Sequence, residues 1–204
     1  MITMTANLMT GELVADDPVS GDRMADARTA EQIAADEFVA RPRPADEESR
    51  RVWEVAATVC DPELPVLTIE DLGVLREASL VRGVAQVSIT PTYTGCPAIS
   101  AMATDVKAAL VAAGYPDAIV HTVYAPAWTS DWISDEGKRK LEEFGIAPPV
   151  ARAGVCPIRA AISVQCPQCG SRNTRQESRF GAAPCRALYV CQDCLEPFDY
   201  FKVH

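Results

Sequence analysis

The sequence has only two histidines, His121 and His204, and neither lies close in sequence to a candidate nucleophile. It also has no Ser-His-Asp order, no Walker phosphate-binding loop and no GxGxxG dinucleotide fingerprint. These absences argue against a triad hydrolase and against a nucleotide-binding enzyme. We expect His121 to be a structural residue within a strand.

Long hydrophobic runs and an excess of basic residues are also absent. No apolar run approaches the roughly 18–20 residues that a membrane-spanning helix needs. The first residues lack the basic and compact apolar regions of a secretory signal peptide, so we expect a cytoplasmic protein with no membrane partner. The chain of 204 residues has 28 acidic and 19 basic residues. It therefore shows no basic footprint of the kind that marks a nucleic-acid binder.

The composition changes along the chain and predicts four segments. Of the first 50 residues, 11 are acidic and 5 are basic, and their low hydrophobicity predicts a disordered acidic tail over residues 1–44. Apolar residues then recur at regular spacing and predict a folded domain over 45–145, followed by a linker at 146–162. Residues 163–204 form a unit too small to hold a core without a metal or another staple.

The segment 45–145 is predicted to be a small α/β domain, in a protein of the α+β class. Its apolar spacing indicates the order helix, strand, strand, helix, strand, helix. Arg82-Gly83 separates two β-prone segments and predicts a β-hairpin, and Ser134 is placed to cap the last helix. The expected elements are a helix over 46–59 that stops at the prolines of 61–65, strands on both sides of 82–83, a helix over 97–113, a strand over 118–125 and a helix over 134–144.

Eight cysteines are the strongest signal in the sequence. A CxxC motif at Cys166 and Cys169 is followed by 21 residues and then by a second CxxC motif at Cys191 and Cys194. In a cytoplasmic protein such pairs indicate a metal site more often than disulfides. Four thiolates complete the closed tetrahedral shell of structural zinc. With their β-prone flanks, the motifs predict a zinc ribbon, and iron in a rubredoxin-like site is the alternative.

Cys185 is a fifth cysteine in a unit where four suffice. It is a spare thiol, an alternative metal ligand, a reactive group or a small buried hydrophobic residue. Four arginines nearby are expected to offset the negative charge of the thiolate shell. They are Arg172, Arg175, Arg179 and Arg186.

In the first domain, Cys96 stands directly before the helix that is predicted to begin at Pro97. Unpaired N–H groups and partial positive charge at a helix N-terminus lower the pKa of a nearby thiol. We therefore expect Cys96 to be a thiolate that attacks an electrophile or holds a soft metal. The alternative is a small residue packed beneath a loop. Cys60 is expected to be a core residue rather than a ligand.

Two carboxylates and three hydroxyls accompany this cysteine. Asp61 and Glu63 follow the first helix, where they coordinate a metal, cap backbone N–H groups or are solvated. Thr90, Thr92 and Thr94 alternate in the loop before the second helix and are expected to orient that loop or to bind an anion.

Several separated segments resemble known protein families. DPELPVLTIEDLGVLR (61–76) and ITPTYTGCPA (89–98) resemble the signature segments of the iron–sulfur cluster assembly domain family. WTSDWISDEGKRKLEEFGIAPP, CPQCGS, RFGAAPCRA and CLEPFDYFK further resemble the D-subunit family of the bacterial phenylacetyl-CoA epoxidase system of phenylacetate catabolism. The resemblance covers residues 46–204. Within it, Ala182 and Ala183 stand where Ser and Thr are expected.

The resemblance implies a compact α/β domain with a C-terminal zinc ribbon, and a role in maturation rather than catalysis. The chain is expected to help install iron or an iron–sulfur cluster in other epoxidase subunits, especially the iron–sulfur reductase subunit. Cys96 is then a transient ligand of iron or of a cluster, with Asp61 and Glu63 completing the site, and the four ribbon cysteines hold structural zinc. The alternatives are an adaptor that docks epoxidase subunits through the ribbon without handling metal, and an enzyme or electron carrier with iron in the ribbon.

Overall fold

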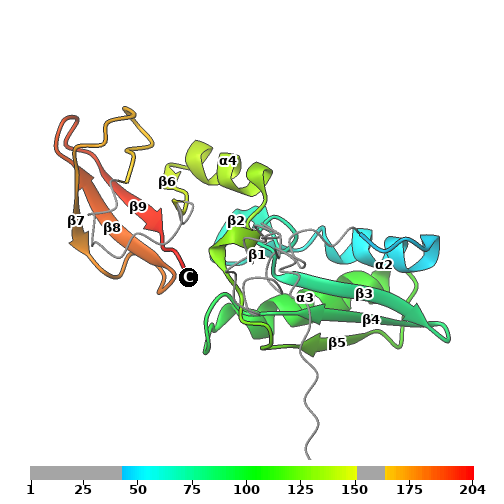
Figure 1. Ribbon diagram of the computed structural model, residues 1–204. Helices are drawn as coiled ribbons and strands as arrows, with labels where there is room; N and C mark the ends of the chain where they lie inside the picture. The colour runs from blue at the N-terminus through cyan, green and yellow to red at the C-terminus, as the bar shows by residue number, and fades with distance from the viewer. Residues whose placement is uncertain (1–42, 151–163) are drawn as a thin grey trace, which may run out of the picture.

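The computed structural model describes residues 43–150 and 164–204, which form two units (Figure 1). Residues 1–42 of the expected tail at 1–44 lie outside the described residues. The expected linker at 146–162 lies outside them from residue 151 onward, and so does Cys156. No helix within the described ranges combines the length and the apolar character that crossing a membrane requires.

A three-stranded sheet forms the base of the first unit. Its strands are β3 (Leu75–Val81), β4 (Val84–Ile89) and β5 (Ile119–Thr122). β3 and β4 are antiparallel and β4 and β5 are parallel, in the order β3-β4-β5. Arg82 and Gly83 adopt positive φ angles of 52° and 81°, as a tight two-residue hairpin turn requires. The predicted hairpin is confirmed.

Two helices, α2 (Glu47–Ala56) and α3 (Ala98–Ala112), pack against this sheet and against each other. Asp46 caps the N-terminus of α2, because its Oδ1 accepts a hydrogen bond from the N–H of Ser49 at 2.7 Å. α3 connects β4 to the parallel strand β5, as the crossover between parallel strands requires. Their buried faces are formed by Ser49, Val52 and Ala56 of α2 and by Ala98, Met102, Val106 and Leu110 of α3.

The segment after α2 differs from the prediction. The helix ends at Ala56 rather than at residue 59, and the segment expected only to stop it lies in an antiparallel strand pair. The strands are β1 (Cys60–Asp61) and β2 (Leu64–Thr68). Pro62 and Pro65 are exposed, so their missing N–H groups cost the pair little. Cys60, expected in the core, is exposed as well.

The short helix η1 (Ser130–Trp132) and then helix α4 (Asp135–Glu143) lead from the first unit toward the second. The Oγ of Ser134 accepts from the N–H of Gly137 at 2.9 Å, which confirms the predicted cap. Asp71 anchors this helix, because its Oδ2 accepts from the Nζ of Lys140 at 2.7 Å and its backbone carbonyl accepts from the N–H of Ser134 at 2.9 Å.

The second unit is a ribbon of four strands in the order β6-β9-β8-β7. They are β6 (Ile146–Ala147), β7 (Thr174–Ser178), β8 (Arg186–Cys191) and β9 (Pro197–Phe201). β6 falls within the segment expected as a linker, and it pairs in parallel with β9. Figure 1 shows α4 and β6 between strand β9 and the three-stranded sheet of the first unit. The α+β class, a small α/β domain followed by a β-ribbon, is confirmed; the exact domain boundaries stay a prediction.

A continuous hydrophobic core joins the ribbon to the first unit. Ala183, Cys185 and Phe201 of the ribbon belong to the same buried cluster as the sheet and helices of the first unit. The rings of Trp128 and Phe201 lie 6.1 Å apart, and Thr129 Oγ1 donates to the carbonyl of His204 at 3.0 Å. These contacts hold the ribbon in one position against the first unit.

Candidate metal sites

The two CxxC motifs of the ribbon bring four thiols together. The Sγ atoms of Cys166, Cys169, Cys191 and Cys194 all lie within 4.8 Å of one another, and no other group of three potential ligands meets that limit within residues 43–150 and 164–204. The Cys166–Cys194 and Cys169–Cys191 Sγ distances are 3.8 and 3.5 Å. Zinc–sulfur bonds of about 2.3 Å in a tetrahedron place sulfurs about 3.8 Å apart. The four thiols therefore fit a tetrahedral metal ion, as predicted.

Backbone and side-chain contacts prepare this four-thiol site. The N–H of Cys194 lies 3.5 Å from the Sγ of Cys191. Together with the N–H of Asp193 and the neighbouring thiols of Cys194 and Cys169, it lowers the pKa of Cys191 to about 6. Asn173, near the first CxxC motif, donates to the carboxylate of Asp193 in the second at 2.7 Å, and Ser171 donates to the same carboxylate. Hydrogen bonds thus link the segments that carry the two CxxC motifs, in addition to the metal ion that the four thiols are suited to bind.

Cys96 lies in the loop before α3 and is 7% exposed. Burial raises the pKa of its thiol, and the nearby carboxylates of Asp61 and Glu63 raise it further. The backbone N–H groups of Ala98 and Ile99, at the start of α3, lower it but do not reverse the shift. The expectation of a thiolate at neutral pH is therefore wrong, because the loss of water around Cys96 outweighs the favourable helix end.

Asp61 and Glu63 are brought to Cys96 by the turn between β1 and β2. Asp61 is 7% exposed and Glu63 is half-buried. Burial raises the pKa of Asp61 even though its Oδ1 accepts from the N–H of Glu63 at 2.7 Å, a contact that favours the ionised form. The predicted trio is therefore close in space, while metal binding by it stays a prediction.

The three threonines of the preceding loop have different environments. Thr90 and Thr92 are buried, with 1% and 8% exposure, whereas Thr94 is exposed. The N–H of Thr90 donates to the carbonyl of Val74 at 2.9 Å and so fixes the beginning of the loop. Both roles predicted for the threonine hydroxyls, orienting the loop and binding an anion, stay predictions.

Cys185 faces the first unit rather than the four-thiol site. It is 6% exposed and shares a buried cluster with Cys96. Burial raises the pKa of Cys185 to about 11, and the charges of Glu63 and Asp61 contribute in the same direction. Tyr93 lies in the same loop as Cys96; burial raises its pKa, and the charges of Cys96, Glu63 and Cys185 raise it further.

We call Asp61, Glu63, Cys96 and Cys185 the interdomain cluster, since three of its members come from the first unit and one comes from the ribbon. The sequence pattern around Cys185 did not predict that this residue packs against the first unit, and no pattern marked Tyr93 as a candidate site residue. The signal that singled out Cys185 was its presence as a fifth thiol, within the RFGAAPCRA segment that carried the family resemblance.

Arg186 places a positive charge beside the interdomain cluster. It is 9% exposed, and its charge opposes the effect of burial by lowering the pKa of Asp61 and of Cys185. Its Nη1 donates to Asp199 Oδ2 at 2.9 Å. Its Nε is buried and has no hydrogen-bond partner among the residues that the structure describes. A buried donor without an acceptor thus belongs to the residue that directly follows Cys185 and whose charge acts on Asp61.

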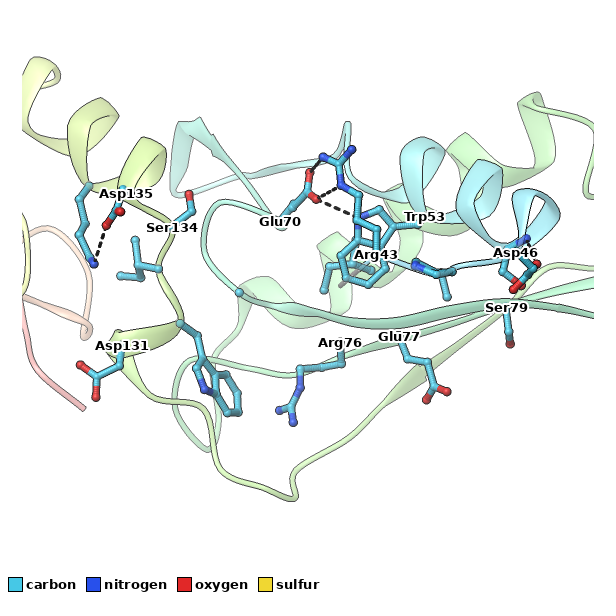
Figure 2. A pocket seen from close by; sticks show the side chains of 18 residues that line it. Arg43, Asp46, Trp53, Glu70, Arg76, Glu77, Ser79, Asp131, Ser134 and Asp135 are labelled. Atoms are coloured by element: carbon cyan, nitrogen blue, oxygen red, sulfur yellow. Dashed lines mark hydrogen bonds and ion pairs between the residues drawn. The ribbon is translucent and has the colours of Figure 1, made fainter. Parts of the chain in front are cut away.

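A separate hollow of about 700 Å³ lies among α2, β3 and the segment before α4 (Figure 2). On its wall, Glu70 accepts from Arg43 Nε at 2.8 Å and from Trp53 Nε1 at 2.9 Å. The guanidinium of Arg76 lies 4.1 Å from the centre of the Trp132 ring. None of the predicted site residues lines this hollow, so it is distinct from the interdomain cluster.

Comparisons with known proteins assign the chain to a family. Residues 153–202 match the family described as "PaaD zinc beta ribbon domain", and residues 49–119 match "Iron-sulfur cluster assembly protein". Over 151 residues the chain is 39% identical to an Escherichia coli (strain K12) protein provisionally named as the D subunit of 1,2-phenylacetyl-CoA epoxidase, with 74% of this chain and 90% of that protein covered. The chain belongs to the epoxidase D-subunit family. Within this D-subunit family chain, Asp61, Glu63 and Cys96 lie in the assembly-type match.

Two solved structures are similar to part of this D-subunit family chain. A domain of unknown function from Bacillus anthracis is 27% identical with a TM-score of 0.42, and the match covers 46% of this chain and 90% of that one. A conserved hypothetical protein from Thermotoga maritima is 22% identical with a TM-score of 0.39, and the match covers 50% of this chain and 98% of that one.

Proposed function

We propose that this chain is an accessory maturation subunit of a phenylacetyl-CoA epoxidase system, in aerobic phenylacetate catabolism. Its cargo is iron or an iron–sulfur cluster, and its client is an epoxidase partner, foremost the reductase subunit that carries such a cluster. The observation that carries the proposal is the buried thiol of Cys96 beside the carboxylates of Asp61 and Glu63, within the segment that matches the iron–sulfur cluster assembly family.

The donor set of Cys96, Asp61 and Glu63 suits a cargo that is held and then released. Burial keeps the Cys96 thiol in its protonated form, so a metal must displace a proton before it binds, and protons compete with the cargo. A closed shell of four thiolates has the opposite character, because it retains its ion. We therefore assign transfer to the first unit and permanent metal binding to the ribbon.

The ribbon then serves as a docking unit that its own metal keeps folded. Zinc is the ion we propose for the four-thiol site, and its contribution is structural. Because the ribbon shares a buried core with the first unit through Phe201 and Cys185, a folded ribbon also supports the surroundings of Cys96.

Co-expression of the epoxidase subunits with this chain or with its Cys96→Ala variant tests the transfer role. We expect iron and acid-labile sulfide in the purified reductase subunit to fall with Cys96→Ala, while the zinc content of this chain is unchanged. The matched control is Cys60→Ala, which removes an exposed thiol outside the interdomain cluster and leaves partner iron at the wild-type level. Unchanged partner iron with Cys96→Ala would refute transfer through this residue.

Exposed apolar side chains on the ribbon favour a second function, the docking of epoxidase subunits without metal transfer. Phe180 and Leu195 are 69% and 73% exposed. Leu195 directly follows Cys194, the last ligand of the four-thiol site, and adopts a positive φ of 65°. The adaptor function predicts that Leu195→Ser reduces co-purification with epoxidase subunits. It also predicts that Cys96→Ala leaves both co-purification and partner iron unchanged.

A further inference from the structure

Building on the proposed function, we propose that Cys96 of the first unit and Cys185 of the ribbon are two thiolate ligands of one iron–sulfur cluster bound between the units. Arg186 donates a hydrogen bond from its Nε to this cargo. The cargo is then a cluster with its own sulfide rather than a bare iron ion, and the site is complete only when the ribbon lies against the first unit.

The first support is the position of the two thiols. Cys96 and Cys185 are 7% and 6% exposed and belong to one buried cluster, although they come from different units. Cysteine thiolates are the usual protein ligands of iron–sulfur clusters.

The second support is the spread of the ligands. In the described part of the chain, no three ligand atoms from the interdomain cluster lie within 4.8 Å of one another, whereas the four ribbon thiols do. A single ion requires all its ligands to converge on one point. A cluster with two or more irons distributes its ligands over its irons, so a wider arrangement of thiols and carboxylates matches it better.

The third support is the free donor of Arg186. A buried N–H without an acceptor is destabilising and requires an explanation. The Nε of Arg186 is such a group, and it belongs to the residue that directly follows Cys185. Hydrogen bonds to sulfur are a normal part of protein-bound clusters. A bare iron cation offers no acceptor, whereas the sulfide of a cluster does.

Transfer of the cluster to this site by ligand exchange requires no electron transfer. An iron–thiolate bond of the donor cluster breaks, an iron–Sγ bond to Cys96 or Cys185 forms, and the proton of that cysteine leaves on the released thiol. Repeating the step at the second cysteine places the cluster between the units. Arg186 and Asp199 stay paired throughout, since Nη1 and Nε are different donors of one guanidinium.

The test offers the full-length, zinc-loaded chain a preformed small-molecule [2Fe–2S] thiolate cluster under anaerobic conditions, and Fe(II) alone in a parallel arm. Iron and sulfide are measured after desalting, together with the visible absorption of the cluster. The variants are Cys185→Ser, Cys96→Ser and the exposed control Cys60→Ser. Zinc content and melting temperature are measured for each, and Cys185→Ala replaces Cys185→Ser should the serine disturb the buried site.

We expect the wild type and Cys60→Ser to retain the cluster and its sulfide, and to retain far less iron from Fe(II) alone. Cys96→Ser and Cys185→Ser should each retain at least about tenfold less cluster, a loss that even removing a group that merely supports a metal ligand can produce. Full retention by Cys185→Ser and Cys185→Ala, with loss in Cys96→Ser, overturns this inference and leaves the proposed function intact. Equal uptake of iron from both arms overturns the assignment of a cluster as the cargo. Retention of neither cargo by the wild type counts against the proposed function itself.

Discussion

Arg186 Nη1 donates to Asp199 Oδ2 at 2.9 Å, and both side chains are largely buried, with 10% and 17% exposure. The pair joins the start of β8 to β9. It holds in place the guanidinium whose charge lowers the pKa of Asp61 and Cys185. An ion pair inside the ribbon thus contributes to the electrostatics of Asp61 in the first unit and of Cys185 in the ribbon.

Gly181→Ala is expected to break this pair. A Cβ at residue 181 lies 2.4 Å from Oδ1 of Asp199, so the carboxylate must turn away and leave a buried guanidinium without its partner. We expect a loss of about 1–3 kcal/mol in the free energy of unfolding, measured by chemical denaturation of the zinc-loaded chain. Ala182→Ser, at the adjacent exposed position, is the control and should change stability little. A Gly181→Ala chain as stable as the wild type contradicts the geometry described here.

Cys169→Ser is expected to abolish metal binding by the ribbon and to unfold it. Structural zinc binds with an apparent free energy of about 10–16 kcal/mol in small zinc units, and that energy is folding energy. Zinc analysis and amide hydrogen exchange over residues 164–204 report the loss, with Cys60→Ser as the control. Persistent protection of strands β8 and β9 in a metal-free Cys169→Ser chain would show that the metal is dispensable for the ribbon.

Asp71→Asn is expected to destabilise the attachment of α4 by about 1–3 kcal/mol at neutral pH. Burial opposes ionisation of Asp71, but Lys140 and Thr68 overcome it and lower the pKa of Asp71 below its ordinary value of 3.8. A lowered carboxyl pKa contributes stability above the unfolded value, and that stability is lost as the pH falls through the folded value. The difference in melting temperature between wild type and Asp71→Asn should therefore shrink below pH 3.8.

The control for that experiment is Glu143→Gln, which removes an exposed ion pair with Arg139 from the same helix. Exposed pairs contribute about 0–1 kcal/mol, so we expect a small effect. If the two variants lose equal stability, Asp71 is an ordinary surface charge rather than the anchor of α4.

Cys96 is expected to react slowly with iodoacetamide near neutral pH, more slowly than the exposed thiol of Cys60. Burial raises the pKa of Cys96 and limits access to it, and the thiolate is the form that reacts. The rate at Cys96 should rise as the pH approaches and passes 9, the ordinary thiol value. Peptide mass spectrometry after timed alkylation measures both rates, and faster labelling of Cys96 than of Cys60 at pH 7 would contradict a raised pKa.

Features with local causes could be predicted from the sequence. The hairpin at Arg82-Gly83 follows from the positive φ that its turn needs, and the start of α4 follows from the Ser134 cap. The four-thiol site follows from the spacing of two short motifs. In each case the deciding contacts lie within a few residues, or within a motif whose spacing fixes the geometry.

Features that depend on distant packing could not be predicted in this way. The prolines of 61–65 indicate the end of a helix, but only the burial of Leu64 and Leu67 against the core explains the strand β2. The pKa of Cys96 depends on burial by the whole first unit rather than on the helix end beside it. Cys96 and Cys185 share one hydrophobic core only because the ribbon packs against the first unit, and no local pattern encodes that packing.

The parallel pairing of β6 with β9 has a consequence for cutting the chain into pieces. Ile146 and Ala147 are contributed by the segment that leaves α4, and they cover one side of β9. A ribbon fragment that begins after residue 147 leaves this backbone edge open, and open strand edges recruit other strands. Such a fragment is expected to self-associate even with its metal bound, whereas one that retains α4 and β6 is expected to stay monomeric.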